Sequence, residues 1–223
     1  MPAPRLMYTR RIRFASVYAR SIWSMRAAHP RLERGEGRSK DTEARLNADR
    51  SIGEPTMKTQ EAIAQHFGLM YQTAAANLDG LTQEQSLMHP SPGGNCANWI
   101  LGHLTNVQNG VMGLIGEKPV WESGQLTRAG FDPISGAANA IEWNTMRERF
   151  LGSKDRCLAA ISGLSDRALA ESVPHPFGGT TSRAELLHLL AFHQTYHVGQ
   201  LALSRRIAGL EGAVKGPGQV QKV

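Results

Sequence analysis

Residues 182–208 read SRAELLHLLAFHQTYHVGQLALSRRIA, which is the pattern of one long amphipathic helix. Ser182, with Glu185 three residues later, forms a capping box that marks the start of a helix. Gly209 follows the last periodic residue and marks the end. One face of this helix carries five large apolar side chains, namely Leu186, Leu189, Leu190, Leu201 and Ile207. We therefore expect a helix from Ser182 to about Ala208 whose apolar face points into a helical core.

Three further segments upstream show the same helical spacing of apolar residues, and no segment reads as a strand. Their expected bounds are about Lys58 to Asp79, Asn95 to Ile115 and Ala138 to Ser162. The sequence therefore predicts an all-α protein, a bundle of four helices.

The connections between these segments predict the order in which the helices pack. Short helical turns are expected at Thr82–Ser86 and Ser165–Glu171, within the first and third links. The second link, Glu117–Ala137, has about twenty residues and is rich in proline and glycine. This length suits a long crossover along the bundle between helices two and three better than a tight hairpin.

Composition limits the function of the chain. The 223 residues suffice for one domain with a sizeable core. The sequence contains no run of 18 apolar residues, so no membrane span is predicted. The net charge of +6 lies wholly in residues 1–56, which hold 12 Lys and Arg against 6 Asp and Glu, so the remainder is neutral. We therefore expect neither a nucleic acid nor a membrane as partner. The two cysteines, Cys96 and Cys157, form no CxxC motif and indicate a reducing, cytoplasmic location.

The two ends of the chain differ from its middle. Residues 1–56 are basic and lack a periodic apolar face, which predicts a disordered N-terminal extension. Alternatives are an organellar presequence or a true translation start at Met57. We expect the bundle to occupy residues 57–210 and a flexible tail, rich in glycine and lysine, residues 211–223.

Three histidines are the candidate metal ligands. His193 and His197 are four residues apart on the apolar face of the last helix, so both rings can reach one ion, whereas His188 should face outward. The helix has no acidic residue between Glu185 and Glu211, and a cation would satisfy both buried imidazoles.

His103, on the inner face of the second helix, is the expected third ligand. His66 borders the same interior; we expect it in the core or behind a ligand, with a fourth-ligand role as the alternative.

Two stretches also carry a family resemblance. The segments NWILGHL at 98–104 and HQTYHVGQL at 193–201 resemble the two signature stretches of the DinB-like superfamily, over about residues 57–208. The resemblance implies a four-helix bundle of unusual helix order with a three-histidine metal centre, often dimeric. His103, His193 and His197 correspond to the family's ligands, and Gln200 to the glutamine of its motif. Relatives include thiol-dependent S-transferases and mycothiol-dependent maleylpyruvate isomerase.

An enzyme is the first functional hypothesis. Three neutral imidazoles leave a coordination position open, as in catalytic metal sites, and zinc or nickel suits such ligands. We expect a small electrophilic substrate, a low-molecular-weight thiol as cosubstrate and transfer of its sulfur. Gln200 would contact a bound water or substrate, or instead satisfy a buried carbonyl. Tyr196 would pack or line the mouth of the site.

Two other classes stay open. One is a non-enzymatic bundle in which the metal joins helices two and four, acting as a stress-response or binding module; a fourth ligand at His66 would favour it. The other is a hydrolase in which a metal-activated water attacks the substrate. In each case a homodimer is an expected assembly.

Overall fold

The computed structural model describes residues 57–91, 93–122, 124, 126 and 132–213, and it is mostly helical. The main helices are α2 (Thr59–Leu78), α4 (Ala97–Leu114), α6 (Trp143–Gly152), α7 (Lys154–Ser162) and α9 (Arg183–Ile207). The shorter elements are α3 (Gln83–Ser86), η2 (Ala137–Asn139), α8 (Asp166–Ala170), β1 (Ser172–Pro174) and β2 (Thr180–Ser182). The predicted all-α architecture is thus confirmed, although β1 and β2 form a small two-stranded sheet that we did not predict.

All the helices belong to one compact unit, from which only Pro174–Thr180 is separate among the described residues. The prediction for residues 1–56 and most of the prediction for the tail, 214–223, lie outside the described residues. No described helix has the length and apolarity needed to cross a membrane.

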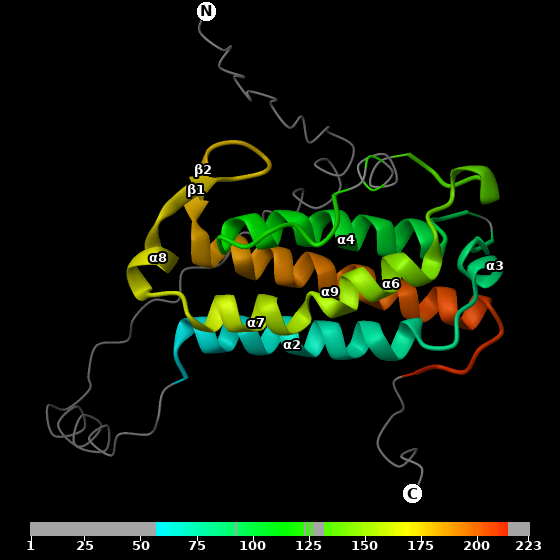
Figure 1. Cartoon of the computed structure of the whole chain (residues 1–223), viewed down its shortest axis with the longest axis horizontal. Coiled ribbons are helices and arrows are strands. Elements are labelled where there is room, and N and C mark those ends of the chain that lie inside the picture. The colour runs from blue at the N-terminus through cyan, green and yellow to red at the C-terminus, as the bar shows by residue number, and fades with distance from the viewer. Residues whose placement is uncertain (1–56, 92, 123, 125, 127–131, 214–223) are drawn as a thin grey trace, which may run out of the picture. The chain divides into compact units, whose positions relative to one another are not determined.

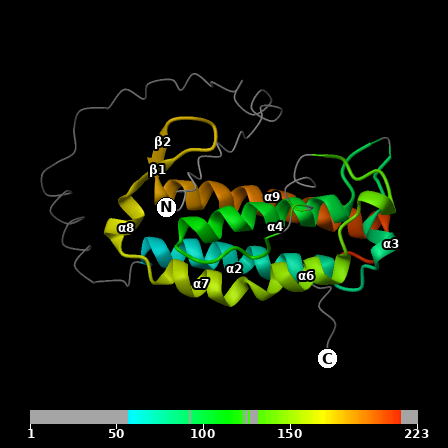
Figure 2. The same ribbon diagram turned by 45° about the horizontal axis from the view of Figure 1, so that its top comes forward.

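The helices form a bundle in which α2 packs on α7 and α9, while α4 packs on α6 and α9. Figure 1 and Figure 2 show that α2 and α9 run in one direction, and that α4, α6 and α7 run in the other. Because α4 and α6 are consecutive main helices with the same direction, the chain has to return along the bundle between them. This is the predicted crossover between the second and third helices.

The crossover also contributes to the core. Val120, Leu126 and Ile134 are buried, so this connection is more than a solvent-exposed loop. Its start is held by Asn109 of α4, whose Oδ1 accepts from the Val120 N–H at 2.7 Å and whose Nδ2 donates to the Trp121 carbonyl at 2.9 Å.

The third predicted helix differs from the observed one at its start and in its middle. It begins at Trp143 instead of Ala138, because Glu142 accepts from the N–H groups of Asn144 and Thr145 and caps it. It then breaks at Ser153, whose hydroxyl donates to the Phe150 carbonyl at 2.6 Å. Such back-bonding bends helices. The Tyr71 hydroxyl is hydrogen-bonded to the Ser153 hydroxyl at 2.7 Å, and this contact fixes the break against α2.

The second predicted helix begins later than expected. Its expected start was Asn95, but the N-cap is Cys96, whose side chain makes no capping bond. Asn98 holds this end instead, through paired hydrogen bonds with the backbone N–H and carbonyl of Ile141. The start of α4 is therefore set by a contact with a distant segment.

Candidate metal centre

Two adjacent helices bring three imidazoles together. His103 comes from α4, and His193 and His197 come from successive turns of α9. The Nε2 atom of His193 lies 3.4 Å from that of His103 and 3.1 Å from that of His197. One ring nitrogen from each residue lies within 4.8 Å of both others. Among the described residues, these three histidines are the one group of His, Cys, Asp or Glu side chains close enough together to hold a metal ion.

The spacing of these nitrogens fits a small divalent ion. Zinc binds imidazole nitrogen at about 2.0–2.1 Å, and in a tetrahedral site this places neighbouring ligand atoms about 3.3–3.4 Å apart. Two of the three nitrogen pairs are close to that separation. The donor set is also chemically suitable, because three facing imidazoles cannot all satisfy one another by hydrogen bonds.

The site lies beside the core of the bundle instead of at its centre, which corrects our expectation. The core side of α9 is formed by fully buried residues, Leu187, Ala191, Gln194, Val198 and Leu201. His197 is 4% exposed, but His103 and His193 are only partly buried, and Leu189 and Leu190 likewise. The inner face of α9 differs from the predicted apolar face because the polar Gln194 occupies a core position. His188 is exposed, as predicted.

Burial keeps two of the three rings in the form that binds a metal. Burial, together with the neighbouring His197, lowers the pKa of His193 to about 4. Burial also lowers the pKa of His197, although its hydrogen bond with Gln200 acts in the opposite direction. Both imidazoles are therefore neutral at neutral pH, and metal coordination needs neutral imidazole.

The ring of each ligand is held differently. His103 stacks on Trp99, with the ring centroids 5.1 Å apart and the planes within 7° of parallel. The Nδ1 atom of His197 lies 2.7 Å from Oε1 of Gln200. The buried Nδ1 of His193 has no hydrogen-bond partner in the described part of the chain. Gln200 is thus placed behind a ligand.

His66 and Tyr196 are the two residues near the site for which the sequence left more than one role open. His66 lies outside the three-histidine group, and its Nε2 is 3.3 Å from the hydroxyl of Thr195, on the side of α9 that faces α2. The alternative of a fourth ligand at His66 therefore has no support in the geometry. Tyr196 is 52% exposed, its ring stands edge-on to His197 at 5.2 Å, and its hydroxyl accepts from Gln200 Nε2 at 3.4 Å.

Sequence reasoning missed a buried polar chain that crosses the core next to the site. Gln194 Nε2 donates to Gln108 Oε1 at 2.8 Å, and Gln108 Nε2 donates to the Cys157 sulfur at 3.2 Å. Burial raises the pKa of the Cys157 thiol to about 11, so this cysteine is a thiol at neutral pH. These hydrogen bonds between buried side chains could have been suspected from the sequence, because Gln108 and Gln194 both lie among the apolar residues of their helices.

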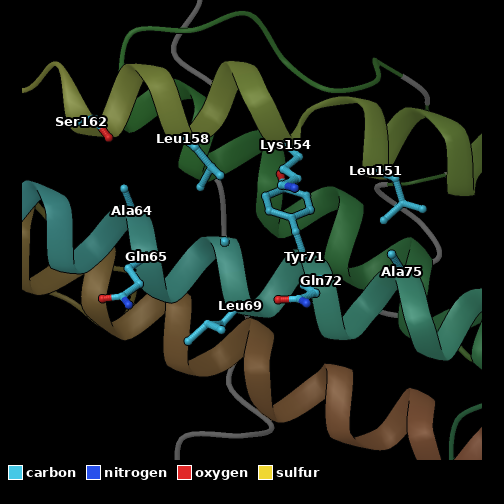
Figure 3. Close-up of a pocket in the computed structure, with 11 residues that line it drawn as sticks. Ala64, Gln65, Leu69, Tyr71, Gln72, Ala75, Leu151, Lys154, Leu158 and Ser162 are labelled. Carbon is cyan, nitrogen blue, oxygen red and sulfur yellow. The ribbon is translucent and has the colours of Figure 1, made fainter. Parts of the chain in front are cut away.

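The structure also has a groove that does not involve the histidines. It has a volume of about 750 Å³ and lies between α2 and the α6–α7 pair. Figure 3 shows Tyr71 pointing from α2 toward Lys154, with Leu151 and Leu158 along the opposite wall. Since none of the three histidines lines it, this groove gives no information about the metal centre.

The comparison with known protein families agrees with this architecture. A family model described as the DinB superfamily matches residues 66–201, a range that includes the three histidines and Gln200. A search of curated proteins gives no match. Since the match covers more than half of the sequence, this chain belongs to the DinB superfamily.

Proposed function

We propose that the protein is a divalent-metal-dependent enzyme whose metal is held by His103, His193 and His197. The observation that carries the proposal is the convergence of three Nε2 atoms from two helices, with separations of 3.1 and 3.4 Å that suit imidazole ligands of one ion. Zinc or nickel is the proposed metal, because both favour imidazole and the group of ligands contains no carboxylate.

The number of protein ligands supports a catalytic site. Structural zinc sites are closed by four protein ligands, whereas catalytic sites have three and leave a position for an exogenous molecule. In the described residues the group stops at three, since His66 is bonded to Thr195. We therefore propose that a small molecule occupies the remaining position.

The proposed reaction is transfer of a low-molecular-weight thiol to a small electrophile. A bound zinc or nickel ion supplies Lewis acidity, which favours the thiolate form of a thiol at neutral pH. The sulfur would form a bond with an electrophilic carbon, its proton would pass to solvent, and any leaving group would depart with its bonding electrons. An external thiol is required because Cys96 and Cys157 are buried, and burial raises the pKa of both thiols.

Cobalt substitution tests this function. We expect the cobalt form of the full chain to gain an intense sulfur-to-metal charge-transfer band when a cellular thiol is added, and to form conjugate with a small electrophile. His197→Ala should abolish both the band and the conjugate. If no thiol in a broad panel changes the spectrum, the thiol reaction is wrong, and hydrolysis of a substrate by activated water becomes the better hypothesis.

A structural metal is the second candidate. It is favoured by the origin of the ligands, because an ion shared by α4 and α9 would join two neighbouring helices. Four-coordinate cobalt that no added thiol, water or anion perturbs would support this candidate over the enzyme.

We also propose that the protein is a cytoplasmic homodimer. The exposed side chains of Phe192 and Leu203 on α9 support an interface, since they are 64% and 58% accessible. Sedimentation of the full chain measures the oligomeric state, and a monomer at micromolar concentration would contradict this proposal.

A further inference from the structure

One of the three ligand rings, that of His197, has a chain of side-chain contacts behind it. His197 Nδ1 contacts Gln200 Oε1 at 2.7 Å, and Gln200 Nε2 contacts the Tyr196 hydroxyl at 3.4 Å. All three residues lie on α9 at helical spacings of three and four, so one rigid helix carries the whole arrangement.

The chemistry of these contacts determines which nitrogen of His197 carries the proton. An amide oxygen only accepts hydrogen bonds, so the nitrogen facing it, Nδ1, must be the donor. In a neutral ring the lone pair is then on Nε2, the atom that faces His193 at 3.1 Å. With the opposite tautomer, the Nε2 proton would occupy the place of the metal.

The orientation of the Gln200 amide is therefore critical, and Tyr196 distinguishes between its two orientations. The amide NH2 group only donates, and it faces a phenol oxygen that can accept. If the amide turned over, its NH2 group would face His197 and favour a ring with its proton on Nε2. The ring of Tyr196 stands edge-on against His197, which also limits rotation of the imidazole.

We infer that Gln200 and Tyr196 are positioning residues that hold His197 in the tautomer that binds the metal. The inference rests on the proposed function in one respect only, the metal bound by the three histidines. His193 provides the contrast, because its buried Nδ1 has no partner in the part of the chain that the structure describes. The ring of His197, unlike that of His193, is thus set through its Nδ1 before a metal arrives.

Two measurements test the inference on the full chain. One is the zinc affinity, by competition with a chromophoric chelator, and the other is the tautomer of His197 in the metal-free protein, by nitrogen-15 NMR of the imidazoles. Gln200→Leu should lower zinc affinity about 10–100-fold, the usual effect of removing a partner behind a metal ligand. The same variant should show a mixture of His197 tautomers.

A charged replacement separates positioning from packing. Gln200→Glu should keep or raise the affinity, because a carboxylate accepts from Nδ1 with either oxygen. Tyr196→Phe should lower affinity a few-fold in the wild-type background, since its 3.4 Å contact is long for a hydrogen bond. It should have no effect in the Gln200→Glu background, where orientation of the group no longer matters.

His188→Ala is the control, because His188 is an exposed histidine on the same helix and lies outside the three-histidine group. It should change neither affinity nor tautomer. Wild-type affinity and tautomer in Gln200→Leu would overturn the inference, as would an equal effect of Tyr196→Phe in both backgrounds. If the wild type binds no zinc, the proposed function fails, while the tautomer measurement still decides the role of Gln200.

Discussion

At the scale of single residues, the candidate site consists of three side chains whose removal should have equal consequences. Each of His103→Ala, His193→Ala and His197→Ala should lose most bound metal, because two imidazoles hold a divalent ion far more weakly than three. Metal content after gel filtration measures the effect. His188→Ala is the control on the exposed side of α9 and should retain the metal. Equal retention in His188→Ala and His193→Ala would contradict the assignment of ligands.

The buried glutamine pair makes a second prediction at this scale. Gln108→Leu leaves the Gln194 amide without its partner in the core and should lower the free energy of unfolding by about 1–3 kcal/mol. The double variant Gln108→Leu, Gln194→Leu should recover much of that loss, since no amide is then left unpaired. Urea unfolding of the single and double variants measures the difference. Additive losses in the double variant would show that the glutamines do not act as a pair.

The sequence located the histidines but not the residues around them. His193 and His197 could be paired because a spacing of four on one helix guarantees that they are neighbours. The contact between Gln108 and Gln194 joins residues 86 positions apart, and the contact between Asn98 and Ile141 joins residues 43 positions apart. No local pattern predicts such contacts, because they depend on which helices become neighbours.

At the scale of elements, the start of α9 depends on a charged capping residue. Glu185 accepts from the Thr181 hydroxyl and from the N–H and hydroxyl of Ser182, and these bonds lower its pKa to about 2. Because the folded pKa is below the ordinary value of about 4.3, the carboxylate stabilises the fold above pH 4 and this contribution is lost as the pH falls toward 2.

Glu185→Gln isolates that charge, since glutamine can still accept a bond from the Ser182 N–H. The variant should be less stable than the wild type at pH 7, and the two should converge near pH 2. Thermal unfolding across this pH range, at low salt, measures the convergence. The difference should shrink in high salt because the carboxylate is at the surface. A difference that does not change with pH would contradict the role of the charge.

The end of a helix could be predicted where its capping partners are near in the sequence. It could not be predicted where the partner comes from a distant segment. The capping box at Ser182 is confirmed because both of its partners lie within one turn. The break at Ser153 was not predicted, since the Tyr71 hydroxyl that fixes it is 82 residues away. The strands β1 and β2 are each three residues long, too short to show an alternating pattern.

At the scale of the whole molecule, the described helices bury their apolar faces against one another. The inward faces of α2, α6 and α7 are formed by buried residues, namely Ile63, Phe67, Met70, Ala74, Leu78, Trp143, Met146, Phe150, Cys157 and Ile161. The crossover was predictable from the length of the second link. Which helices become neighbours was not, because periodicity gives each helix an apolar face but no partner for it.

A chain that begins at Met57 should therefore match the full chain in thermal midpoint and metal content. The reason is that residues 1–56 have no periodic apolar face, while the described helices already bury theirs on one another. Differential scanning calorimetry and metal analysis of the two chains provide the comparison. A fall of several degrees in the midpoint would show that the N-terminal segment packs on the bundle.

The proposed ligands of the candidate metal centre come from α4 and α9, and His193 lies 90 positions after His103 in the sequence. During synthesis, His103 leaves the ribosome long before the other two histidines exist. A nascent chain thus has no complete three-histidine group until α9 has been made and has docked against α4. Metal loading would then come late, after α9 has been made, and a chain truncated before residue 193 would keep only His103 of the three proposed ligands.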